Sequence, residues 1–121
     1  MKSGDIPKDQ RIEKEKNRLK RIYKEMSKDK KDLIEGLIQR ASYMRITLED
    51  YEADLDEHGY VELFSQSDKT EPYERERPVA RLYNTMNKNY QSIIKQLTES
   101  LPKVNNEDKD ELLEFLAGGK R

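Results

Sequence analysis

The sequence predicts a mainly α-helical protein, in which a long antiparallel helical hairpin with a short β-prone connection follows a basic helix and precedes a short C-terminal helix. Two long segments repeat apolar residues at intervals of three and four, and only one short segment between them is β-prone. Of the 121 residues, 40% are charged and 33% are hydrophobic. Because soluble domains are typically about 45–50% apolar, the core must be thin, and we expect several subunits to share it.

The N-terminal segment, residues 1–31, is expected to form a basic helical arm. Over residues 8–26 its apolar positions fall seven, three and four apart, which marks a narrow stripe on an otherwise charged helix. Such a helix is only marginally stable by itself. The stripe consists of Ile12, Leu19, Ile22 and Met26.

The next helix is expected to span about thirty residues, or about 45 Å. Ser27 or Asp29 can cap its N-terminus, and Gly59 can occupy the C′ position at its other end. Its apolar or aromatic positions alternate four and three apart, which is the pattern of a coiled-coil seam. This seam comprises Leu37, Ala41, Met44, Leu48, Tyr51 and Leu55.

Residues 60–73 are expected to form a short strand or hairpin, because YVELF is β-prone and SQSDKTEPY is typical of a turn. Pro78 suits the first position of a third long helix, whose apolar stripe continues until Pro102. Since the two long helices share a period and a compact connection, they should pair antiparallel. We assign residues 32–102 to a central hairpin and oligomerisation domain.

The two seams present more apolar surface than one antiparallel pair can cover. A repeated head-to-tail contact between copies would cover the excess and close into a ring. We therefore expect oligomerisation through the apolar positions Leu37, Met44, Leu48, Tyr51, Leu82, Tyr83, Met86, Tyr90, Ile93 and Leu97.

Residues 103–121 are expected to form a polar linker followed by a short helix that Asn106 can cap. Large apolar side chains on a short helix at a chain end are typical of a segment that inserts into a partner's groove. The alternative, that this helix packs on its own ring, stays open. The expected docking residues are Leu112, Leu113, Phe115 and Leu116.

Charge is unevenly distributed although the formal net charge is only −1. Residues 8–31 carry eleven Lys and Arg against five Asp and Glu, whereas residues 46–78 carry three against eleven. The basic segment can line a phosphate backbone, and a merely solvated helix face is the alternative. The cations that we expect to contact DNA are Lys14, Lys16, Arg18, Lys20, Arg21, Lys24, Lys28, Lys30 and Lys31.

No motif indicates catalysis, a metal or a cofactor, and we expect none of the three. His58 lies where a histidine at a helix end beside a glycine cap is ordinary. Residues 54–65 only partly imitate a calcium-binding loop, since Ser65 occupies the position of its bidentate Glu. The acidic run at 49–57 fits a solvated helix face. An enzyme that uses these carboxylates with a divalent metal stays a further hypothesis.

Two stretches, YMRITLEDYEADLDEHGYVEL and ERPVARLYNTMNKNYQSIIKQL, carry a resemblance to a known family. Over residues 37–101, about half the chain, the sequence resembles the small terminase subunits of tailed double-stranded DNA phages, in the branch with a short central helical hairpin and no N-terminal helix-turn-helix domain. Relatives often continue with a Leu-Gly-Leu-x-Pro and Arg-rich tail, whereas this chain has Leu101-Pro102 and an acidic linker.

The resemblance implies a ring, commonly of about nine subunits, that binds viral double-stranded DNA and presents it to the large terminase subunit, an ATPase and nuclease, during genome packaging. The C-terminal helix would then dock on that large subunit. The alternative is a coiled-coil structural adaptor that oligomerises without binding DNA. Because cysteine is absent and no apolar run is long enough to span a membrane, the expected location is the host-cell cytoplasm.

Overall fold

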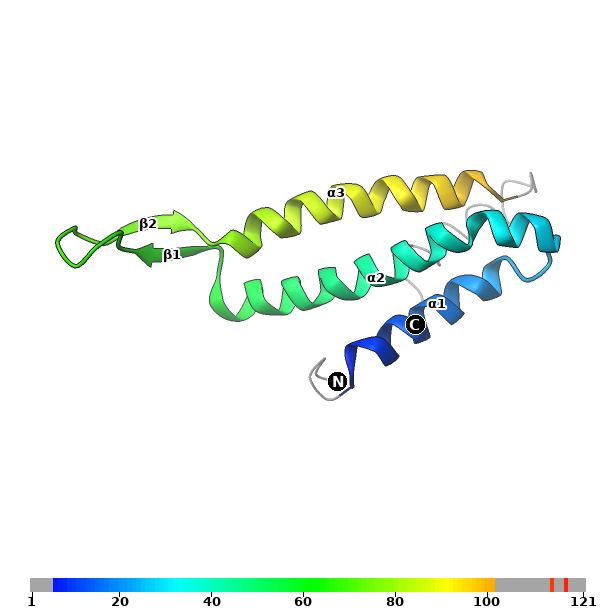
Figure 1. Ribbon diagram of the computed structural model, residues 1–121, viewed down its shortest axis with the longest axis horizontal. Helices are drawn as coiled ribbons and strands as arrows, with labels where there is room; N and C mark the ends of the chain where they lie inside the picture. The colour runs from blue at the N-terminus through cyan, green and yellow to red at the C-terminus, as the bar shows by residue number, and fades with distance from the viewer. Residues whose placement is uncertain (1–5, 102–113, 115–116, 118–121) are drawn as a thin grey trace.

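The computed structural model describes residues 6–101, 114 and 117. Over residues 6–101 the elements are α1 (Lys8–Ile22), α2 (Lys28–His58), β1 (Val61–Phe64), β2 (Tyr73–Glu76) and α3 (Pro78–Glu99). Helix α2 lies between α1 and α3 and runs antiparallel to both (Figure 1). The β1–β2 hairpin projects beyond the helices, at the end opposite the α1–α2 turn (Figure 1). The prediction of a mainly α-helical chain with a small β connection is confirmed.

The two ends of α2 follow from its capping residues. Ser27 is the N-cap, and its hydroxyl accepts a hydrogen bond from the Lys30 backbone N–H at 3.3 Å. At the other end Gly59 has a φ of 83°, a left-handed conformation that favours glycine. Of the two N-caps that the sequence allows, Ser27 and Asp29, the structure uses Ser27, and the predicted glycine cap at Gly59 is confirmed.

Helix α1 ends at Ile22, four residues before the predicted end at Met26. The chain then turns so that the Tyr23 side chain, only 2% exposed, enters the core. The Tyr23 hydroxyl donates a hydrogen bond to the Leu97 carbonyl oxygen of α3 at 2.6 Å. Leu19 is also fully buried, and burying such a side chain contributes about 1.5–3 kcal/mol. Helix α1 is therefore packed as the third helix of one bundle.

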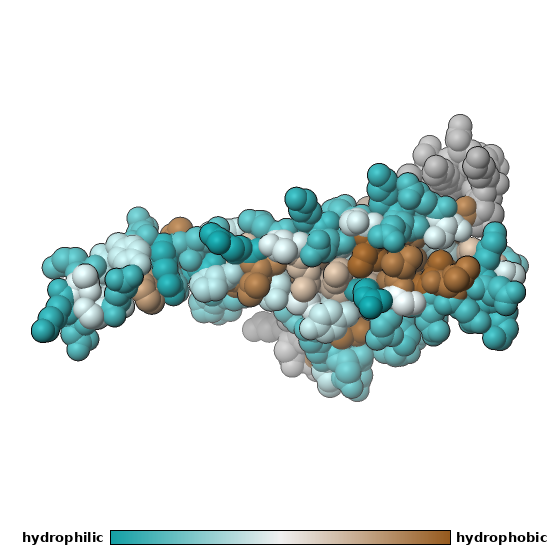
Figure 2. Space-filling view, turned by 45° about the horizontal axis from the view of Figure 1, so that its top comes forward, coloured by the Kyte–Doolittle hydropathy of each residue, from teal (hydrophilic) through white to brown (hydrophobic). Residues whose placement is uncertain are grey.

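Part of the predicted oligomerisation set lies inside a single chain. Leu48, Tyr90, Ile93 and Leu97 are buried in the core between the three helices. Leu82 is 53% exposed, and Figure 2 shows hydrophobic residues gathered on the helical part of the molecule. The members of the set that keep partial exposure are Leu37, Met44, Tyr51, Tyr83 and Met86.

Arg77 attaches the β1–β2 hairpin to the helices. Its guanidinium donates to the Gly59 carbonyl oxygen at 2.7 Å and to Asp54 Oδ1 at 2.9 Å. Its backbone N–H donates to the Tyr60 carbonyl oxygen at 2.8 Å. Because these bonds join the end of α2 to the start of α3, they hold the base of the hairpin in a defined position.

Candidate nucleic-acid interface

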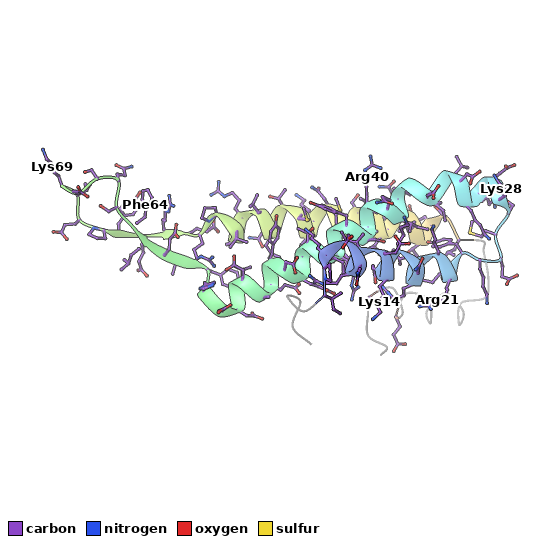
Figure 3. The ribbon with its side chains drawn as sticks, turned by 60° about the horizontal axis from the view of Figure 1, so that its bottom comes forward. Lys14, Arg21, Lys28, Arg40, Phe64 and Lys69 are labelled. Carbon is purple, nitrogen blue, oxygen red and sulfur yellow. The ribbon has the colours of Figure 1, made fainter. Side chains whose placement is uncertain are left out.

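The predicted DNA-contacting cations lie on α1, on the α1–α2 turn and on the first turn of α2. Lys14 and Arg21, two turns apart on α1, point away from the bundle, and Lys28 lies at the start of α2 (Figure 3). Within residues 6–101, no carboxylate lies within 4.0 Å of the charged group of six of these cations. Those six are Lys14, Lys20, Arg21, Lys24, Lys30 and Lys31.

The other three cations of the predicted set are paired within the protein itself, and one of them, Lys28, lies 3.3 Å from Asp32. Arg18 donates from Nε and Nη2 to the two carboxylate oxygens of Glu15, each at 2.7 Å. Lys16 lies 3.7 Å from a Glu13 oxygen and donates to Gln39 Oε1 at 3.2 Å. The Glu15–Arg18 spacing of three is a known helical pairing, so the sequence alone could have indicated it. Arg18 therefore acts mainly in the fold.

A hollow of about 250 Å³ lies between the end of α1 and the start of α2. Three exposed lysines border it, and buried aromatic and aliphatic side chains form its apolar part. We call it the lysine-rimmed hollow. It is lined by Lys20, Tyr23, Lys24, Lys31, Asp32, Ile34, Glu35 and Ile38.

An ionic cluster joins α1 to the middle of α2. Arg11 donates to Asp50 Oδ1 at 2.7 Å and to Glu49 Oε1 at 3.2 Å. Arg45 Nε lies 3.6 Å from Glu49 and 4.0 Å from Glu15, whose side chain is 9% exposed. This cluster was not predicted from the sequence, because Arg11 lies 39 positions from Asp50 and 38 positions from Glu49. Only the Arg45–Glu49 spacing of four was a local signal.

Tyr90 of α3 borders this ionic cluster. Burial raises the pKa of Tyr90, although the neighbouring Arg45 guanidinium acts to lower it. For Arg45, burial acts to lower the pKa, but the interaction with Tyr90 and the charges of Glu15 and Glu49 outweigh burial and raise it. Both shifts move the pKa further above neutral pH, so Arg45 stays charged and Tyr90 stays neutral there.

The acids of the run at 49–57 in α2 are exposed or half-buried, and several of them also have partners within the protein. Besides the two acids of the ionic cluster, Glu52 accepts a hydrogen bond from the Tyr83 hydroxyl at 2.9 Å. Asp54 accepts one from Arg77 at the same distance. His58 is exposed and lies 4.0 Å from Asp54 and 3.9 Å from Glu57. In the part of the chain that the structure describes, no group of three acidic, histidine or cysteine side chains could hold a metal ion.

The predicted docking residues Leu112, Leu113, Phe115 and Leu116 lie outside the described residues. Within the described ranges, no helix is both long and apolar enough to cross a bilayer. No known protein-family model matches the chain, and neither curated proteins nor solved structures gave a significant match.

Proposed function

We propose that this chain is a small terminase subunit, which binds viral double-stranded DNA and, as a ring of copies, presents it to the large terminase subunit. One observation carries the DNA-binding part of the proposal: exposed cations without carboxylate partners among residues 6–101 gather at the α1–α2 end. Acidic residues outnumber basic ones over residues 46–78, which include the β1–β2 hairpin, whereas basic residues outnumber acidic ones over residues 8–31. The packaging role comes from the resemblance over residues 37–101.

Binding of this kind is electrostatic and indifferent to base sequence. Lysine and arginine side chains that neutralise phosphates release condensed counterions, so affinity falls as salt rises, with a log–log slope of about −0.9 for each phosphate contacted. Lys14 and Arg21 point outward from one face of α1, a geometry that can follow a backbone. The expected property is therefore a steep salt dependence with little discrimination between duplexes.

A triple charge reversal tests the surface. Lys14→Glu, Arg21→Glu and Lys30→Glu change exposed side chains that neither line the lysine-rimmed hollow nor lie near a described carboxylate. We expect the variant to bind duplex DNA at least about tenfold more weakly at 0.1 M salt, with the magnitude of its salt slope reduced by about 2–3, because up to three phosphate contacts are lost. Fluorescence anisotropy with a labelled duplex measures both, and circular dichroism checks the fold.

The matched control makes the same change in charge elsewhere, with Lys69→Glu, Lys88→Glu and Lys95→Glu on the hairpin and α3. It should retain the parent's salt slope. A loss of DNA binding in this control but not in the triple variant would place the DNA contact on the hairpin and α3 instead. Retained assembly with no DNA binding at any salt concentration would favour the structural adaptor instead. Metal-dependent cleavage of plasmid DNA would favour an enzyme.

A further inference from the structure

The two faces of the β1–β2 hairpin differ in how many of their side chains have partners within the chain. On one face the Phe64 and Tyr73 rings meet edge to face, with centroids 6.0 Å apart. The Arg75 guanidinium lies 3.5 Å from the Phe64 ring centroid and donates to Glu62 at 2.7 Å. A cation over an aromatic ring and an ion pair together occupy most of this face, although Tyr73 remains 46% exposed.

The other face leaves apolar side chains in solvent. In the antiparallel register Val61 lies opposite Glu76 and Leu63 opposite Glu74, so these four side chains share one face, which we call the outer hairpin face. Val61 is 54% exposed and Leu63 is 73% exposed. A lone two-stranded hairpin is at best marginally stable in water, so covering this face would stabilise it.

The lysine-rimmed hollow has the complementary chemistry. Its floor is formed by Tyr23 and Ile34, which are only 2% and 5% exposed, so the side chains that a partner can contact are mainly the exposed lysines at its border, of which Lys24 and Lys31 can face carboxylates. Two acids also line it: Asp32, which pairs with Lys28 at 3.3 Å, and the exposed Glu35, so the three lysines leave the hollow with an excess of positive charge. The outer hairpin face offers the reverse pattern, an aliphatic pair flanked by glutamates.

We propose that the outer hairpin face of one copy docks into the lysine-rimmed hollow of a second copy. The two surfaces lie at opposite ends of the molecule, so they cannot meet within one chain (Figure 1). Two different surfaces make a head-to-tail contact, which repeats from copy to copy and forms a ring if the rotation closes. The inference rests on the assembly proposed above but not on DNA binding. Lys20, Lys24 and Lys31 would face protein, which leaves Lys14, Arg21 and Lys30 for DNA.

Cysteine cross-linking tests the contact, because the chain has no native cysteine. Leu63→Cys and Lys31→Cys full-length proteins, one of them isotopically labelled, are mixed without DNA under mild oxidation. We expect a disulfide-linked dimer that contains one copy of each, since only closely approaching cysteines can form the bond. Lys14→Cys mixed with Leu63→Cys is the control, because Lys14 is exposed on α1 but outside the hollow. Mass spectrometry identifies the products.

A yield no higher than in the control would overturn the proposal. A dominant Leu63→Cys homodimer would overturn it too, because it would show that hairpins pair with each other. Two further variants give an independent test by sedimentation, Leu63→Asp and the double change Lys24→Glu with Lys31→Glu. Each alone should lose the higher oligomer, and a mixture should give only heterodimers, since one intact contact remains. Recovery of no heterodimer would contradict the head-to-tail contact and leave the DNA test above unaffected.

Discussion

Individual polar groups attach α1 to the other helices at several points, among them the Lys16–Gln39 hydrogen bond at 3.2 Å. At the α1–α2 turn the Tyr23 hydroxyl bonds to the Leu97 carbonyl oxygen. Two turns or more earlier, Arg11 and Glu15 bring charge to α2 in the ionic cluster. Because a buried polar group without a partner costs free energy, these bonds also penalise other placements of α1. The apolar stripe alone would allow α1 to shift along α2 more easily.

Tyr23→Phe removes the hydrogen bond to the Leu97 carbonyl oxygen and keeps the aromatic ring. We expect a loss of about 1 kcal/mol in the free energy of unfolding at neutral pH, measured with urea. Burial raises the pKa of Tyr23 to about 12, above the ordinary 10, so between these values the unfolded state releases its proton first. The stability that Tyr23 contributes is therefore complete below pH 10 and is lost as pH rises toward 12.

The phenylalanine variant lacks that titration, so its unfolding free energy should fall less steeply than the parent's between pH 10 and 12. Tyr43→Phe, at a side chain that is 49% exposed, is the control and should follow the parent curve. Parallel curves for the parent and Tyr23→Phe would contradict a buried, neutral hydroxyl at this position.

Among the secondary-structure elements, α2 organises the others, since α1 and α3 both pack on it. Its ends depend on single residues, whereas its interior contains a glycine, Gly36, at a position where the helix does not need one. Glycine inside a helix is destabilising, and glycine at a left-handed C-terminal cap is favourable. The same residue type therefore has opposite effects at the two places.

A pair of alanine substitutions tests this difference. Gly36→Ala should raise the free energy of unfolding by about 0.5–1 kcal/mol, because the added Cβ would meet only the mobile end of Arg40, at 3.4 Å. Gly59→Ala should lower it by about 1–2 kcal/mol, because alanine is strained at a φ of 83°. Thermal and urea unfolding of the two variants check both signs. An unchanged or raised free energy of unfolding for Gly59→Ala would show that the cap is not strained, and a lowered one for Gly36→Ala would show that the helix needs that glycine.

At the scale of the whole molecule, the described residues form an elongated structure (Figure 1), and charge is unevenly distributed along the sequence. Its basic α1–α2 end and its acid-rich hairpin end are separated by the length of α2, which has 31 residues. Such a distribution attracts polyanions to one end and orients copies of the chain head to tail. The two proposals thus use different parts of the same asymmetry.

Truncation after Val104 tests the proposed interaction with the large terminase subunit. If the C-terminal segment docks on the large terminase subunit, the shortened chain keeps its oligomeric mass and DNA affinity but no longer binds that subunit or stimulates its ATPase, because the apolar docking residues are gone. Native mass spectrometry and an ATPase assay with the large subunit measure this. A truncated protein that falls apart into monomers would show that the segment is structural.

The sequence by itself determined the features that depend on neighbouring residues. Helix α2 begins after Ser27 and ends before Gly59, and α3 begins at Pro78. The intervals of three and four between apolar residues identify the buried faces of the helices. The predicted DNA-contacting cations could likewise be named from local charge, because a run of lysines and arginines is visible without a fold.

Only the tertiary structure decided which cations pair with carboxylates and which residues from distant parts of the sequence come into contact. Tyr23 and Leu97 are 74 positions apart, and Arg11 lies 38 and 39 positions from its partners. The lysine-rimmed hollow likewise needs the end of α1 to meet the start of α2. These contacts depend on how far one helix slides and rotates against another. Periodicity within a helix reveals which face is apolar, but it does not specify that register.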